Sequence, residues 1–315
     1  GYSGAAPIVL EGEDAQQAIT DDNRRTTPRP QLARDPKFDE ISPQVGEINE
    51  DAVSDLAEED PDHALSMLAE MRTATDQKLA AIAARIAGRL VLDVARVGPR
   101  QARGIGTMVS SPADRYEGDL DLERSLDGLI QARAAGELVD AGDLFVRHWT
   151  RPATAVTLVV DRSGSMSGRR LATAAVAAAA CAYRAPIDWS VLAFADRVIA
   201  VKSQDDARSP TAVGDDLLRL RGQGTTDLAG ALRAAASQLE RSRAKRRVTV
   251  LMSDCRATTG AEAIPIARRL DELCILAPAD DDADAIEFAK SVGARIASID
   301  GPSEIPAALL GVLDA

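Results

Sequence analysis

The chain has 315 residues, a formal net charge of −12 and three cysteines. This length allows at least one large hydrophobic core and predicts two folding units. The acidic balance excludes nucleic acid as the main partner, because phosphate binding needs a basic face. Cys181, Cys255 and Cys274 lack the spacing of metal ligands, which favours three buried thiols and gives no sign of an oxidising compartment.

Residues 1–60 are acidic and interrupted by proline. They contain fifteen Asp or Glu against five Arg or Lys, and Pro28, Pro30 and Pro36 break regular elements. Two alternatives remain open for this arm, a solvated and partly disordered segment or an ordered segment that wraps a neighbour.

Residues 61–150 are predicted to form a mainly helical region. Apolar residues recur at helical spacing from Leu79 to Leu90 and again from Leu122 to Ile130. A strand is expected over residues 143–149, and it leads into a third region, residues 151–315.

Strands and helices alternate in residues 151–315. The candidate strands are residues 155–160, 190–195, 198–201, 248–252, 274–276 and 295–299. Residues 198–201 follow the preceding strand after only two residues, which predicts a hairpin and an antiparallel edge strand. The pattern predicts an α/β fold with a doubly wound, mainly parallel sheet.

Oxygen donors follow the first of these strands. Asp161, Ser163 and Ser165 occupy alternate positions on the loop that leaves the strand, where open α/β sheets place their ligand sites. One carboxylate and two hydroxyls are hard donors that suit Mg²⁺ or Mn²⁺. The sequence therefore predicts a metal site.

Two further loops occupy matching positions. One precedes the helix expected from Leu228 and offers Thr225 or Thr226, and the other carries Asp254 after the strand 248–252. Loops at the carboxyl ends of parallel strands converge. These donors can neutralise a divalent cation and leave one coordination place for water or a partner.

The combined motifs carry a family resemblance. They are Asp161-x-Ser163-x-Ser165, Gly224-Thr225-Thr226-Asp227-Leu228 and Leu251-Met252-Ser253-Asp254. Over about residues 150–315 the chain resembles a von Willebrand factor A (VWA) domain with a metal-ion-dependent adhesion site. The resemblance implies that Ser163 and Ser165 ligate the ion directly, and Asp161 and Asp254 directly or through water. Thr226 is the better match for the family threonine, whereas Cys255 stands where the family usually has glycine.

The preceding region narrows the resemblance. Residues 118–126, 143–147 and 160–166 are similar to the intracellular bacterial branch that includes the CoxE-like proteins and, more distantly, the D subunit of magnesium chelatase. Members of this branch typically work beside a MoxR-type AAA+ ATPase. The resemblance thus implies a metal-dependent adaptor for such an ATPase, or for a client protein that offers an Asp or Glu to the metal, in protein remodelling or metal-cofactor maturation.

The residues argue against catalysis. The chain has no P-loop motif, and its two histidines, His63 and His148, lie outside any nucleophile motif. We expect a binding protein rather than an enzyme. The alternatives are a stand-alone ligand-binding module without an ATPase and a metal-dependent hydrolase.

The location is expected to be cytoplasmic. No secretory segment opens the chain, and its longest uncharged stretch, residues 171–183, is too short to span a bilayer.

Overall fold

The computed structural model describes residues 9–22, 26–96, 107–113, 119–135, 143–150, 154–163, 168–222, 224–257 and 262–314. The chain divides into two compact units. The larger unit comprises residues 1–100 and 154–315, and the smaller comprises residues 101–153. These boundaries differ from those drawn at residues 60 and 150, because the first 100 residues pack with the last 162.

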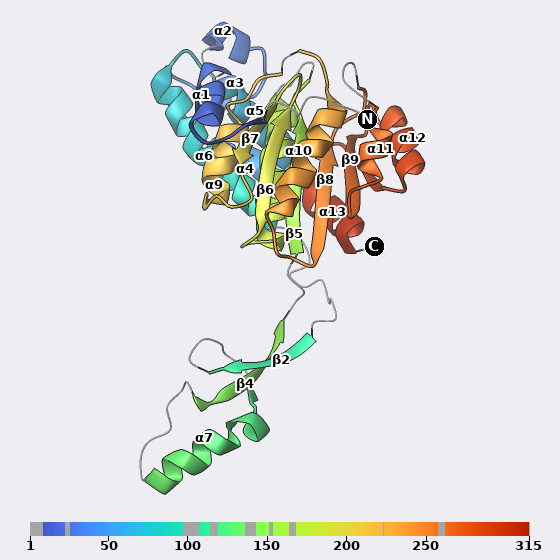
Figure 1. Ribbon diagram of the computed structural model, residues 1–315. Coiled ribbons are helices and arrows are strands. Elements are labelled where there is room, and N and C mark those ends of the chain that lie inside the picture. The colour runs from blue at the N-terminus through green and yellow to red at the C-terminus, as the bar shows by residue number, and fades with distance from the viewer. Residues whose placement is uncertain are drawn as a thin grey trace. The chain divides into compact units, whose positions relative to one another are not determined.

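A seven-stranded sheet forms the centre of the larger unit (Figure 1). Its order is β1-β7-β6-β5-β8-β9-β10. The strands are β1 (Val9–Leu10), β5 (Thr154–Asp161), β6 (Trp189–Phe194), β7 (Val198–Lys202), β8 (Arg246–Met252), β9 (Glu272–Pro278) and β10 (Arg295–Ile299). All neighbours pair in parallel except β6 and β7, whose antiparallel pairing confirms the predicted hairpin. The short β1 pairs with the outer side of β7. The predicted edge position of β7 is therefore wrong, because β1 occupies that edge.

Helices cover both faces of this sheet, which confirms the predicted α/β class. Alternate strand residues point to opposite faces, so Leu158 and Val160 pack on the α8 side while Val159 and Leu251 pack on the α10 side. The first face carries α8 (Gly168–Arg184), α9 (Pro210–Leu217) and α13 (Ile305–Asp314). The second carries α10 (Leu228–Glu240), α11 (Ile264–Ala267) and α12 (Ala283–Val292).

The first hundred residues add a further helical layer over α8. Its helices are α1 (Gly12–Asp22), α2 (Arg29–Leu32), α3 (Phe38–Ile41), α4 (Glu50–Glu59), α5 (Pro61–Met71) and α6 (Gln77–Arg96). Helices α5 and α6 both pack against α8, which is buried along nearly its whole length. A run of alanines lets the neighbouring helices come close to α8 on several sides.

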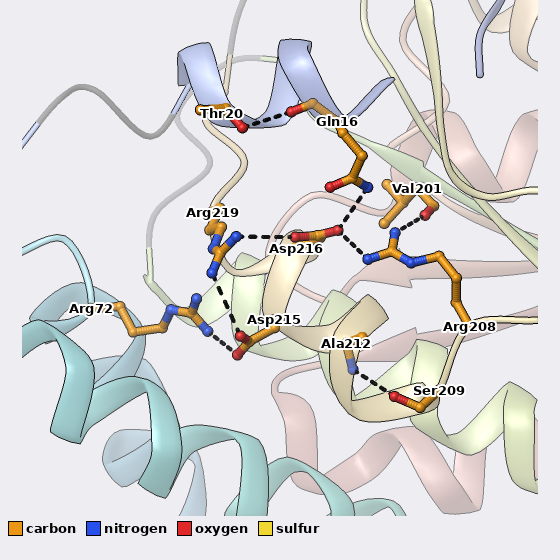
Figure 2. Close-up of polar contacts among 10 residues, drawn as sticks. All are labelled: Gln16, Thr20, Arg72, Val201, Arg208, Ser209, Ala212, Asp215, Asp216 and Arg219. Carbon is orange, nitrogen blue, oxygen red and sulfur yellow. Dashed lines mark hydrogen bonds and ion pairs between the residues drawn. The ribbon is translucent and has the colours of Figure 1, made fainter. Parts of the chain in front are cut away.

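The described parts of residues 1–60 are ordered and pack against the rest of the same chain. Ile19, Phe38 and Ile41 are fully buried in the core of the larger unit. A polar contact adds to this packing: Gln16 of α1 donates to Asp216 of α9 at 3.1 Å (Figure 2). Although the segment is acidic overall, each of its helices α1, α3 and α4 contributes a few buried apolar residues to the core.

In its described residues the smaller unit contains an antiparallel sheet and one helix. Its strands β2 (Thr107–Pro112), β4 (Phe145–Thr150) and β3 (Asp119–Leu120) pair in that order, beside α7 (Leu122–Ala135). The helix and the strand expected here are present as α7 and β4, and β2 and β3 are two further strands that the sequence did not predict. Arg147 binds Asp121 at 3.0 Å and holds the pKa of this carboxyl at about 2.

Among the described helices, none combines the length and the apolar character that a membrane span requires.

The close approach of α5 to α8 yields a stability prediction. A Cβ at Gly168 would lie 2.5 Å from the Ser66 carbonyl oxygen, so Gly168→Ala forces the helices apart. We expect the free energy of unfolding to fall by about 1–3 kcal/mol. Gly311→Ala in α13 meets nothing within 4 Å, and this control should stabilise by up to about 1 kcal/mol. Urea denaturation followed by circular dichroism measures both, and equal effects would contradict the prediction.

Candidate metal centre

Asp161 lies at the carboxyl end of β5, with Ser163 two residues later. The backbone N–H of Ser163 donates to Asp161 Oδ1 at 2.8 Å, which closes a tight turn after the strand. The intervening Arg162 N–H donates to the Phe194 carbonyl at 2.9 Å and ties the turn to the end of β6. Local backbone contacts thus hold these two predicted ligands.

Ser253 supplies a contact that sequence analysis did not assign. Val160 pairs with Met252 in the parallel β5–β8 ladder, so the next residues of both strands, Asp161 and Ser253, emerge together. The Ser253 hydroxyl donates to Asp161 Oδ2 at 2.6 Å. Burial raises the pKa of Asp161, hydrogen bonds from Ser163 and Ser253 oppose this shift, and the nearby Asp254 carboxylate adds to it. In the sequence, the position of Ser253 directly before the predicted ligand Asp254 could have indicated that Ser253 belongs to the site.

Cys255 adopts the left-handed backbone region, with φ = 63°. Among the described residues it is the only one other than glycine with a positive φ, a conformation that usually favours glycine. Here it lets the Cys255 N–H donate to Ser253 Oγ at 2.9 Å, so the Ser253 hydroxyl hydrogen is left to bind Asp161. Burial raises the pKa of the thiol to about 12, which keeps it protonated and unsuited to binding a metal.

A cavity of about 400 Å³ opens at this edge of the sheet. Asp161, Ser163 and Asp254 line it together with Ser253. Its other described lining residues are Val160, Arg169, Arg170, Thr173, Met252, Leu276, Pro278, Asp280, Ile299 and Asp300. The oxygen donors thus lie beside apolar residues from the ends of the strands. Two arginines from the start of α8 also line the cavity.

Of the other two predicted ligands, Thr226 and Ser165, the structure describes Thr226 alone. Thr226 is 3% exposed and does not line the cavity, whereas Thr225 is exposed. Its loop is attached to the end of β6, because the Asp227 N–H donates to the Ala195 carbonyl at 2.8 Å. Asp227 itself caps α10 by accepting from the Gly230 N–H. Ser165 lies outside the described residues.

The donor set fits a small, hard cation. Asp161, Asp254 and the hydroxyl of Ser163 offer oxygen only, as Mg²⁺ and Mn²⁺ prefer. Within the described ranges no three His, Cys, Asp or Glu side chains gather as a metal cluster. An ion here would therefore depend on serine and threonine hydroxyls as well as on the two carboxylates.

The sheet, its helical layers and the oxygen donors at its carboxyl edge define an α/β domain of the VWA type. Residues 94–285 match the family model described as "VWA domain containing CoxE-like protein". This match covers more than half of the chain, which therefore belongs to that family. No curated protein sequence matches the chain.

Solved structures give weaker likenesses. A von Willebrand factor type A protein from Catenulispora acidiphila is 17% identical with a TM-score of 0.40, over 52% of this chain and 42% of that one. Manganese-loaded TRAP protein from Plasmodium vivax is 16% identical with a TM-score of 0.42, over 50% and 72%. BatB from Bacteroides thetaiotaomicron is 13% identical with a TM-score of 0.42, over 51% and 97%.

The Ser253–Asp161 hydrogen bond predicts a defect in metal affinity. Ser253→Ala removes a contact that orients a prospective ligand, and such changes typically weaken metal binding 10–100-fold. Asp161→Ala should abolish binding. Ser54→Ala is the control, because its exposed hydroxyl only bonds within α4. Mn²⁺ titration followed by electron paramagnetic resonance measures the affinities, and a Ser253→Ala affinity equal to wild type would contradict the orienting role.

The backbone of Cys255 predicts opposite outcomes for two substitutions. Cys255→Gly accepts φ = 63° without steric cost but loses a buried side chain, so the free energy of unfolding should stay within about 1 kcal/mol of wild type. Cys255→Val places a β-branched residue in this region and should cost about 1–3 kcal/mol. It should also weaken Mn²⁺ binding through Ser253. Urea denaturation and Mn²⁺ titration test both, and a fully stable Cys255→Val variant would refute the strain.

Proposed function

We propose that this chain is a metal-dependent protein-binding adaptor. The observation that carries the proposal is the meeting of Asp161, Ser253 and Asp254 at the carboxyl edge of β5 and β8, facing one cavity. The proposed ion is Mg²⁺ or Mn²⁺. Its proposed protein ligands are Asp161, Ser163, Ser165, Thr226 and Asp254.

The cavity suits an acidic partner side chain. A bound Mg²⁺ would offer an open coordination place to a carboxylate oxygen, and its reluctance to lose water would favour a well-placed Asp or Glu. Arg169 and Arg170, at the start of α8, line the same cavity, and their positive charge offsets that of the lining carboxylates Asp280 and Asp300. VWA domains generally mediate metal-dependent protein interactions, which agrees with this chemistry.

Binding rather than catalysis is favoured by the groups present. The described lining of the cavity includes neither His, Cys nor Lys. All three thiols are buried, and burial raises the pKa of Cys181 and of Cys255 to about 12. His63 lies at the start of α5, where its Nε2 is 2.7 Å from Asp35 Oδ2, and it does not line the cavity. These observations support an adaptor with no catalytic residues of its own.

Membership of the CoxE-like family supports a MoxR-type AAA+ ATPase as the partner. The adaptor would dock on the ATPase ring, or on a client that offers an Asp or Glu to the metal. In either arrangement ATP-driven motion would be transmitted to the client, in protein remodelling or in metal-cofactor maturation.

A pull-down from lysate of the source organism tests this function. The bait is the full chain with Mg²⁺, with chelator, or carrying Asp161→Ala. We expect an AAA+ ATPase to be recovered only with Mg²⁺ and intact Asp161. Asp39→Asn is the control, because it removes an exposed carboxylate of α3. Circular dichroism of each bait shows whether it is folded.

The other outcomes are equally informative. An ATPase held equally by all baits would place that interface away from Asp161 and leave the metal for the client. Recovery of a non-ATPase protein only with Mg²⁺ and Asp161 would indicate a stand-alone ligand-binding module. Recovery of no Mg²⁺-dependent partner would contradict the adaptor.

A further inference from the structure

Arg162 stands between two proposed ligands, yet its side chain turns into the body of the protein. It is 1% exposed. Its Nη1 donates to Asp22 Oδ2 at 2.7 Å and to the Arg221 carbonyl oxygen at 3.3 Å. Burial lowers the pKa of Arg162 and Asp22 opposes that shift, but an arginine stays protonated in proteins. A buried cation at this position therefore needs the Asp22 carboxylate.

Asp22 is held in place independently of Arg162. It is the last residue of α1 and is 8% exposed. Helix α1 follows β1, which pairs with β7 in the sheet. Figure 2 shows Gln16 reaching from α1 to Asp216, which Arg208 and Arg219 also contact. The fold thus holds the Asp22 carboxylate next to the side chain of Arg162, the residue between the proposed ligands Asp161 and Ser163.

The Arg162 guanidinium joins three separate segments. Its own backbone lies between Asp161 and Ser163, and its side chain binds the end of α1. It also donates to the carbonyl of Arg221, which precedes by a few residues the loop that carries Thr226. Loss of Asp22 would leave this cation buried without its anion and would disturb both donor-bearing segments together.

We propose that Asp22 is a positioning residue of the metal centre, acting through Arg162 on the turn between Asp161 and Ser163. The inference rests on the proposed metal site. Asp22 lies outside residues 94–285, which the family model matches. The amino-terminal segment would then contribute to the metal affinity of the site. Because such coupling is reciprocal, metal binding must also stabilise the packing of α1 on the rest of the domain.

The test compares two buried aspartates that both anchor α1. Asp22→Asn keeps the shape and removes the charge that faces Arg162. Asp216→Asn is the matched control, because its amide oxygen can still accept from Gln16 and hold α1, while the charge that faces Arg208 and Arg219 is lost. Asp216 is also buried. Both variants should unfold at lower urea concentration. Only Asp22→Asn should weaken Mn²⁺ binding, by 10–100-fold, the size expected for a residue that supports a metal ligand.

Two further measurements separate positioning from stability. The double variant Asp22→Leu/Arg162→Met replaces the ion pair by apolar groups, which should restore much of the stability while Mn²⁺ affinity stays low. In wild type and in Asp216→Asn, Mg²⁺ should slow hydrogen exchange of the α1 amides. In the double variant it should not, because the link through Arg162 is gone.

The outcomes distinguish the two proposals. Wild type that binds Mn²⁺ no more tightly than Asp161→Ala overturns the metal centre, and the role of Asp22 with it. If wild type binds Mn²⁺ and either Asp22→Asn or the double variant binds it with the same affinity, only the positioning role of Asp22 is overturned. If Asp22→Asn fails to fold, the double variant decides by the same criterion.

Discussion

Parallel pairing of β5 with β8 is the constraint on which the centre depends. Because Val160 pairs with Met252, Asp161 and Ser253 leave neighbouring strands at the same level and share a hydrogen bond of 2.6 Å. A shift of either strand by one residue would turn these side chains to the opposite face. The burial of apolar residues in β5 and β8 fixes their register, and this register also sets the positions of Asp161 and Ser253. The left-handed backbone of Cys255 then orients the Ser253 hydroxyl toward Asp161.

The amino-terminal region supports this edge at two points. Arg162, near the start of the loop between β5 and α8, pairs with Asp22 of α1, and Gly168, at the other end of this loop, packs against the backbone of Ser66 in α5. Both supporting residues precede the part of the chain that the CoxE-like family model matches. The VWA-type sheet supplies the donors, whereas the added helical layer restrains both ends of the loop that carries them.

Local patterns predicted much of the larger unit because each element carries its own signal. The run expected over residues 155–160 lies within β5, and the helix expected from Leu228 is α10, which begins at that residue. Carboxylates after strands placed Asp161 and Asp254 at the sheet edge, where both line the cavity. For residues 1–60 the same reasoning left two alternatives open, because the buried face of α1 offers a single large apolar residue, Ile19, beside two alanines in a mainly polar and acidic segment.

The sequence by itself determined the α/β class, the hairpin of β6 and β7 and the oxygen donors that follow β5 and β8, since these depend on side-chain order within a few residues. Only the tertiary structure decided that Ser253 bonds to Asp161, that Cys255 takes a glycine-like backbone, and that Arg162 turns inward to meet Asp22. Asp22 and Arg162 are 140 residues apart. Such contacts arise from strand register and helix packing, and these are settled by burying apolar surface across the whole chain.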